Sequence, residues 1–178
     1  MVTSVLANRI GRRAVFDSTG QYRYVLLRTW PTSAAIPPAT LVFVMLNPST
    51  ADHRCDDPTI RRCMGFAQSW GYGQLEVVNL FGLKTPHPRQ LSQSSQPIGA
   101  ENDRYLLTAV EQAERVVMAW GNWGHLQGRD RAIFNLLNPY LSKCHCFGWT
   151  KANQPRHPLY LKRTAALQPV LSSRPAAH

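Results

Sequence analysis

The feature of this sequence that most constrains its fold is an alternation between short apolar segments and amphipathic ones. Each of four apolar segments is too short for a buried helix; they cover residues 41–46, 75–83, 115–121 and 143–149. The segments between them have helical spacing, and residues 57–71 show it best, with Asp57 as a typical cap and Pro58 at the first helical position. Strands that alternate with helices form parallel sheets covered on both faces. The sequence therefore predicts a three-layer α/β/α fold around a four-stranded, mainly parallel sheet.

A pair of β-rich segments precedes this alternation. Residues 13–17 and 22–30 flank a Ser-Thr-Gly turn, so we expect an N-terminal β-hairpin over residues 13–30. A chain of 178 residues has the length of one domain. We expect residues 1–178 to form a single, monomeric domain with its α/β core over residues 41–165.

The charge of the chain predicts a polyanionic partner. Twenty Lys and Arg residues stand against ten Asp and Glu residues, which gives a formal charge of +10 spread along the sequence. Such a surface attracts nucleic acids, so we expect DNA, single- or double-stranded, as the partner; a merely soluble basic protein is the alternative. No apolar segment has the length of a membrane span, and the first residues lack the pattern of a secretory signal. These features predict a cytoplasmic protein with no membrane partner.

The cysteines do not have the spacing of a metal site. They stand at Cys55, Cys63, Cys144 and Cys146, without a C-x-x-C pair. We expect reduced thiols and no cofactor or metal, and an iron–sulfur cluster remains an alternative.

Polar side chains follow each of the predicted strands. Asn47 comes directly after the first, Asn79 stands within the second, residues 121–124 read Gly-Asn-Trp-Gly after the third, and His157 lies in the loop after the fourth. Ligands of parallel sheets bind outside the carboxyl ends of the strands, so we expect these side chains to share one pocket. Two carboxamides and an imidazole in one pocket can orient a water molecule and recognise the edge of a base. The chain lacks Walker and Rossmann glycine spacings, which disfavours an NTPase or a dehydrogenase.

Three aspartates follow the first strand, at Asp52, Asp56 and Asp57. Asp57 is expected to cap the helix. One of the three could also act as a base, and the group could hold Mg²⁺, which is the second alternative for a cofactor.

The same motifs, taken in chain order, resemble the uracil-DNA glycosylase superfamily over residues 41–165. The similar parts are an apolar strand that ends in Asn47-Pro48, the segment VVNLFGL at residues 77–83, the Gly-bounded loop 121–124, and His157-Pro158 beside basic residues. The mismatch-specific and single-strand-selective branches are the most similar. The words LNPSTAD and DDPTIRR resemble more strongly a family of small bacterial and phage proteins that is known only as a domain of unknown function.

The resemblance to glycosylases implies a DNA-directed N-glycosylase that removes a deaminated or modified, flipped-out base. In that family's terms, Asn47 would position the attacking water and His157 would stabilise the departing base. Base recognition would fall to Asn79, with Ser49, Thr50 and Trp123 beside it. Leu159 and Tyr160 would form the wedge that replaces the flipped nucleotide. Phosphates would bind to Lys151, Arg156, Lys162 and Arg163.

Two departures from the glycosylase pattern affect these expectations. Ser49 and Thr50 stand where those enzymes have glycine, so the base need not be uracil, and Leu159-Tyr160 replaces a Ser-Pro pair that would contact phosphate. Two other functions remain as alternatives: a nucleic-acid-binding protein that kept the fold without the chemistry, and a metal-dependent enzyme that processes nucleotides with Asp52, Asp56 and Asp57.

Overall fold

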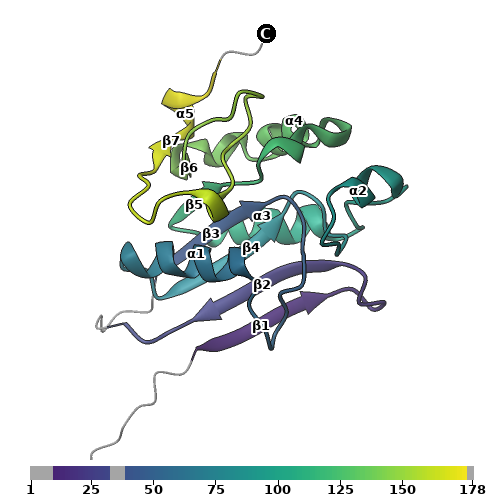
Figure 1. The fold of residues 1–178 in the computed structure, drawn as a ribbon, viewed down its shortest axis with the longest axis horizontal. Helices are drawn as coiled ribbons and strands as arrows, with labels where there is room; N and C mark the ends of the chain where they lie inside the picture. The colour runs from purple at the N-terminus through teal and green to yellow at the C-terminus, as the bar shows by residue number, and fades with distance from the viewer. Residues whose placement is uncertain (1–9, 33–38, 176–178) are drawn as a thin grey trace, which may run out of the picture.

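The computed structural model describes residues 10–32 and 39–175, so the start of the chain, where we expect no secretory signal, lies outside the described residues. Its strands form one sheet in the order β1-β2-β4-β3-β5-β6-β7 (Figure 1). The strands are β1 Gly11–Phe16, β2 Arg23–Thr29, β3 Thr40–Met45, β4 Gln74–Asn79, β5 Arg115–Met118, β6 Cys144–Cys146 and β7 Gln168–Pro169. The helices are α1 Pro58–Ser69, α2 Arg89–Gln93, α3 Asn102–Gln112, α4 Arg129–Leu136 and α5 Val170–Ser173, with 3₁₀ helices η1 Asn122–Gly128, η2 Asn138–Lys143 and η3 Pro158–Tyr160. Within these ranges, every helix is too short or too polar to cross a membrane.

The prediction of a four-stranded sheet is correct for the parallel centre and wrong for the extent of the sheet. Strands β4, β3, β5 and β6 are parallel to one another, as expected. However, β2 pairs antiparallel with β4, and β7 pairs antiparallel with β6, which makes a seven-stranded mixed sheet. The predicted hairpin exists and is part of this sheet. It covers the edge of β4, whose backbone groups would otherwise lack partners.

Helices cover both faces of the sheet. Side chains of β3 alternate, so that Val42 and Val44 join the apolar cluster of α3 and α4, while Leu41 and Phe43 join the cluster of α1. The expected cap of α1 is confirmed, because Asp57 accepts a hydrogen bond of 2.8 Å from the backbone N–H of Ile60. Right-handed crossovers explain the layers: the chain moves from β3 to β4 in one direction and from β4 to β5 and β6 in the other, so α1 lies on one face and α3 and α4 on the opposite face.

The strand order reverses between β3 and β5. These neighbouring strands are parallel, but the connection after β3 leads to β4 on one side and the connection after β5 leads to β6 on the other. The two connections separate at their starting points, and a crevice opens between them at the carboxyl ends of the strands. The fold therefore provides a ligand site at the place where the sequence puts Asn47 and residues 121–124.

Two buried arginines of β2 hold the loop between β3 and α1. The guanidinium of Arg28 donates to the carboxylate of Asp56 over 2.8 Å and to the main-chain oxygen of Asp52. Arg23 donates to the main-chain oxygen of Ala51. Arg12 of β1 also pairs with Asp56, at 2.7 Å. The hairpin therefore supports the segment that leads from Asn47 to the start of α1.

We expect Arg28→Met to destabilise the protein by roughly 3 kcal/mol, because the Arg28 side chain is fully buried and its loss leaves Asp56 with one partner. Arg12→Met is the matched control, since it removes a partner of the same carboxylate that is 31% exposed. It should cost about 1 kcal/mol or less. Urea unfolding followed by circular dichroism measures both values, and equal losses would contradict this account of the loop.

Candidate functional site

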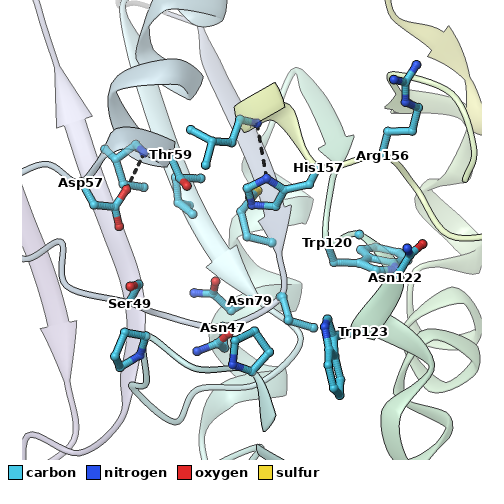
Figure 2. A pocket seen from close by; sticks show the side chains of 18 of the residues that line it. Asn47, Ser49, Asp57, Thr59, Asn79, Trp120, Asn122, Trp123, Arg156 and His157 are labelled. Carbon is cyan, nitrogen blue, oxygen red and sulfur yellow. Dashed lines mark hydrogen bonds between the residues drawn. The ribbon is translucent and has the colours of Figure 1, made fainter. Parts of the chain in front are cut away.

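A cavity of about 660 Å³ occupies the crevice at the carboxyl ends of β3, β4 and β5. Its wall includes Asn47 after β3, Asn79 at the end of β4, Asn122 after β5 and His157 before η3, so the structure brings together the side chains that the sequence predicts to meet (Figure 2). Further lining residues are Arg23, Ser49, Asp57, Thr59, Trp120, Trp123, Arg156, Leu159 and Tyr160.

Asn79 is the most unusual residue of this wall. Its side chain is 1% exposed, and neither its Nδ2 nor its Oδ1 has a hydrogen-bond partner among the described residues. A buried polar group without a partner costs about 1–3 kcal/mol. The end of β4 is nevertheless held firmly, because Asn102 and Arg129 both bind the main-chain oxygen of Leu80, at 3.2 and 2.7 Å. A free donor and a free acceptor thus stand together at a fixed place in the cavity wall.

The hydrogen bonds of its NH₂ group fix the orientation of the Asn47 side chain. Its Nδ2 donates to the main-chain oxygens of Pro48 and Thr85, each over 2.8 Å. Thr85 in turn donates its backbone N–H to the main-chain oxygen of Pro48, which ties the loop after β3 to the loop after β4. With the NH₂ group engaged by backbone, the Oδ1 of Asn47 is left to accept a hydrogen bond from a ligand or a water molecule.

His157 is held as a neutral donor. Its Nδ1 accepts the backbone N–H of Leu159 over 3.3 Å, which caps η3 and leaves the proton of the neutral ring on Nε2. Burial lowers the pKa of His157 below its usual 6.5, and the negative charge of Asp57 partly opposes that shift. The imidazole is therefore neutral at physiological pH and presents an N–H group.

Asp57 and Arg23 add two charges to the same cavity. One carboxylate oxygen of Asp57 caps α1. Asp57 and Arg23 both line the cavity, and the Arg23 side chain is 2% exposed. Burial lowers the pKa of Arg23 to about 10, and Asp57 opposes this shift, so the guanidinium stays protonated at neutral pH. The Nε of Arg23 has no hydrogen-bond partner among the described residues.

Trp120 forms a rigid side wall. It is 1% exposed, and its indole N–H donates to Gln154 over 2.7 Å; Gln154 donates in turn to Asp130. Gly124 lies so close to the indole that a Cβ there would come within 2.1 Å of the Trp120 ring. Trp123, in contrast, is 38% exposed at the rim, and Tyr160 is 88% exposed. Two exposed aromatic side chains, both lining the cavity, are available to stack on a planar ligand.

Several residues predicted for the site lie elsewhere. Thr50 is exposed and does not line the cavity, although Ser49 before it does and Ala51 after it is buried. Asp52 accepts the backbone N–H groups of Arg54 and Cys55 and so shapes a turn, which lowers its pKa. Asp56 is occupied by the two arginines of the hairpin. Exposed side chains outside the cavity are Lys151, Lys162 and Arg163.

Neither proposed metal or cluster site assembles in the described part of the chain. No three His, Cys, Asp or Glu side chains there come together as a metal site, and the three aspartates have separate partners. Cys63 belongs to the apolar cluster of α1, whereas Cys144 and Cys146 belong to the cluster on the opposite face. Burial raises the pKa of all three thiols, to about 12 for Cys144, so they remain protonated.

Arg23 lines the cavity, and Arg28 and Gln154 hold residues beside it, but the sequence pattern identifies none of the three. Arg23 and Arg28 stand near the two ends of β2, on either side of the apolar run of residues 24–27. Charged residues at strand ends are usually exposed, and yet both side chains are buried. Gln154 stands in a polar loop and orients Trp120 through a contact 34 residues distant. Only the hydrogen bonds of Arg23, Arg28 and Gln154 in the folded structure identify these roles.

Fold and cavity together define the class: a mixed α/β protein with a polar pocket at the point where its strand order reverses. The chain belongs to the family described as "Protein of unknown function (DUF1643)", whose model matches residues 23–159. This match confirms the resemblance of the LNPSTAD and DDPTIRR words to a family without an assigned reaction. No curated protein and no solved structure matches the chain.

We expect Asn79→Leu to stabilise the protein by about 1–3 kcal/mol, because it replaces an unpartnered buried amide with an apolar side chain of similar size. Asn102→Leu is the matched control. Asn102 is equally buried, but its Nδ2 donates to the main-chain oxygens of Asn79 and Leu80 at 2.9 and 3.2 Å, so its loss should destabilise the protein. Urea unfolding measures both; a loss of stability in Asn79→Leu would show that the amide is satisfied.

We expect Asp57→Asn to lower the pKa of His157 further, because the carboxylate favours the charged imidazole. Asparagine still caps a helix, so α1 should persist. Because the pKa of His157 is already depressed in the folded protein, stability should fall as the pH drops below about 6.5, and the variant should steepen that loss. An NMR titration of the His157 ring measures the shift. Glu111→Gln, on α3 at the opposite face, is the control. An equal change of the His157 pKa in this variant would show that Asp57 has no specific effect on the imidazole.

Proposed function

We propose that this protein is a DNA-directed N-glycosylase, which hydrolyses the N-glycosidic bond of a deaminated or modified base held in the cavity. The resemblance of the strand-end motifs to uracil-DNA glycosylases suggests the reaction, and the charge of +10 suits a nucleic-acid substrate. A cavity of about 660 Å³ has the size typical of small-molecule sites and accommodates a flipped-out nucleotide.

The observation that carries this proposal is the unpartnered carboxamide of Asn79. A base presents donors and acceptors side by side on its pairing edge, and a carboxamide with a free Nδ2 and a free Oδ1 complements such an edge. The cost of burying this amide is recovered when the base binds. The free Nε of Arg23 in the same cavity supplies a second donor for an oxygen of the ligand.

The proposed chemistry is dissociative. The bond between the sugar C1′ and the base nitrogen breaks, and its electron pair leaves with the base, which becomes an anion. The Nε2–H of His157 and the amide of Asn79 stabilise that negative charge, as preorganised donors do. A water molecule that hydrogen-bonds to Asn47 Oδ1 then adds to C1′.

Asp57 is the acid of the 52–57 segment that suits the final proton transfer. Of the three aspartates, it alone lines the cavity, and one of its oxygens accepts no hydrogen bond from the described residues. Its negative charge stabilises the positive sugar intermediate, and it accepts the proton that the adding water loses. An amide such as Asn47 cannot take that proton, so the two residues have separate tasks.

The test is a base-release assay on oligonucleotides that carry uracil, hypoxanthine or modified pyrimidines, in single and double strands, with alkaline cleavage at the abasic position. The wild-type protein should release at least one of these bases. Asn47→Ala should abolish release and leave DNA binding nearly unchanged, because Asn47 holds water and not the strand. Asn79→Ala should reduce discrimination between bases by roughly 1–3 kcal/mol. Asn135→Ala, an exposed asparagine of α4, is the control that should retain full activity.

Two results would defeat the proposal. Retained release in Asn47→Ala would remove the water-positioning role. Binding without an abasic product from any oligonucleotide would favour the non-catalytic nucleic-acid-binding protein. Loss of release on chelation with EDTA would instead support metal-dependent chemistry.

A further inference from the structure

A second hollow, of about 780 Å³, lies along the outer side of α1. Its lining comes from α1 and from the segment around η3, and includes Arg61, Arg62, Phe66, Leu159 and Arg163. We call it the α1 groove. It is a second hollow beside the cavity described above. The sequence predicts contact with DNA for Leu159 and Arg163 of this lining, but not for Arg61, Arg62 or Phe66.

Arginine supplies all the charge that lines the α1 groove. Among the residues that the structure describes, its lining contains three arginines and no acidic side chain, and α1 itself has no Asp or Glu from Pro58 to Ser69. The described ion pairs do not include Arg61, Arg62 or Arg163. Arg61 does donate to the main-chain oxygen of Asp56, but that partner is neutral. Three positive charges therefore face the groove without compensation.

Two features indicate that these arginines are placed for a ligand and not for stability. Arg61 and Arg62 stand in the first half of α1, near its positive end, where cations are unfavourable. In addition, the Nε of Arg62 is buried and has no hydrogen-bond partner among the described residues, while its guanidinium lies 5.0 Å from the centre of the Phe66 ring. Phe66 thus supports the side chain, whose remaining donors are available to an anion.

The α1 groove adjoins the cavity. Leu159 of η3 lines both hollows, and η3 packs against α1. A strand that placed one nucleotide in the cavity would pass over Leu159 and continue into the groove. Phosphates recur along such a strand at every nucleotide, which suits a row of arginines better than a single anion does.

We propose that the α1 groove binds the phosphodiester backbone of the nucleic-acid strand whose nucleotide enters the cavity. Arg61, Arg62 and Arg163 contact phosphates, and Leu159 with Tyr160 forms the ridge between the two hollows. The proposal rests on the proposed function for the identity of the strand, but it concerns binding and requires no base release. It adds the two arginines of α1 to the phosphate-binding residues that the sequence suggests.

The test measures binding of a fluorescein-labelled thymidine 12-mer, which carries no lesion, by fluorescence anisotropy across a range of salt concentrations. Arg61→Gln/Arg163→Gln removes two exposed arginines of the groove. Each lost phosphate contact lowers the slope of log Kd against log salt by about 0.7 for a single strand, so the slope should fall by about 1.4. If the variant and the wild-type protein bind equally at 1 M salt, this difference in slope makes the variant bind about 25-fold more weakly than the wild type at 0.1 M salt. Arg62→Gln should add a further loss of about fivefold.

The matched control is Arg131→Gln/Arg174→Gln, which removes the same charge from the opposite face. Arg131 lies in α4, and Arg174 follows α5 directly. Its slope should stay near the wild-type value, and thermal unfolding checks that each variant is folded. Equal loss in both double variants, or no loss in the groove variant, would overturn the proposal. So would displacement of the oligonucleotide by a glutamate 12-mer at equal concentration, which would indicate an acidic protein partner. Loss of binding confined to the groove variant supports the groove even if no base is ever released.

Discussion

The reversal of strand order between β3 and β5 is the constraint on which the rest of this structure depends. Because the connections after these two strands leave in opposite directions, neither connection crosses the crevice between them. The loops that border it therefore carry side chains from β3, β4 and β5, together with His157 from the segment after β6. Right-handed crossovers place α1 beside this opening, so the start of α1 and its cap Asp57 become part of the wall (Figure 2).

The cavity wall contains buried polar groups without hydrogen-bond partners, which are rare in a protein core. Asn79 and Arg23 are almost fully buried and yet retain unpartnered atoms, and such groups reduce stability. Two apolar clusters, one on each face of the sheet, provide the burial that offsets this loss. The supporting shell is also well bonded, since Asn102 and Arg129 hold the end of β4 and Gln154 holds Trp120. Of the five unpartnered buried side-chain atoms among the described residues, three belong to Asn79 and Arg23 of the cavity wall; the others are Nε of Arg62 and Oδ1 of Asn102.

Sequence and structure agree where the evidence is local. The cap at Asp57, the first helical position at Pro58 and the apolar strand before Asn47 depend on a few neighbouring residues, and all three appear as expected. Agreement ends where a role depends on a distant partner. Asp52 and Asp56 look alike in sequence, but one shapes a turn and the other pairs with arginines from the hairpin. Thr50 follows Ser49 directly and is exposed outside the cavity, because the order of residues in a loop does not fix which side chains face a pocket.

The sequence by itself determined the alternation of strands and helices, the parallel centre of the sheet and the polar residues at the strand ends, because hydrophobic period and capping chemistry are short-range properties. The tertiary structure alone decided that the hairpin joins the sheet at β4 and that its buried arginines support the loop after Asn47. It also decided that a groove along α1, lined by arginines without acidic partners, lies beside the cavity. These outcomes depend on edge pairing and on charge partners distant in the chain. Spacing along the sequence does not specify which of several edges or carboxylates a given side chain will meet.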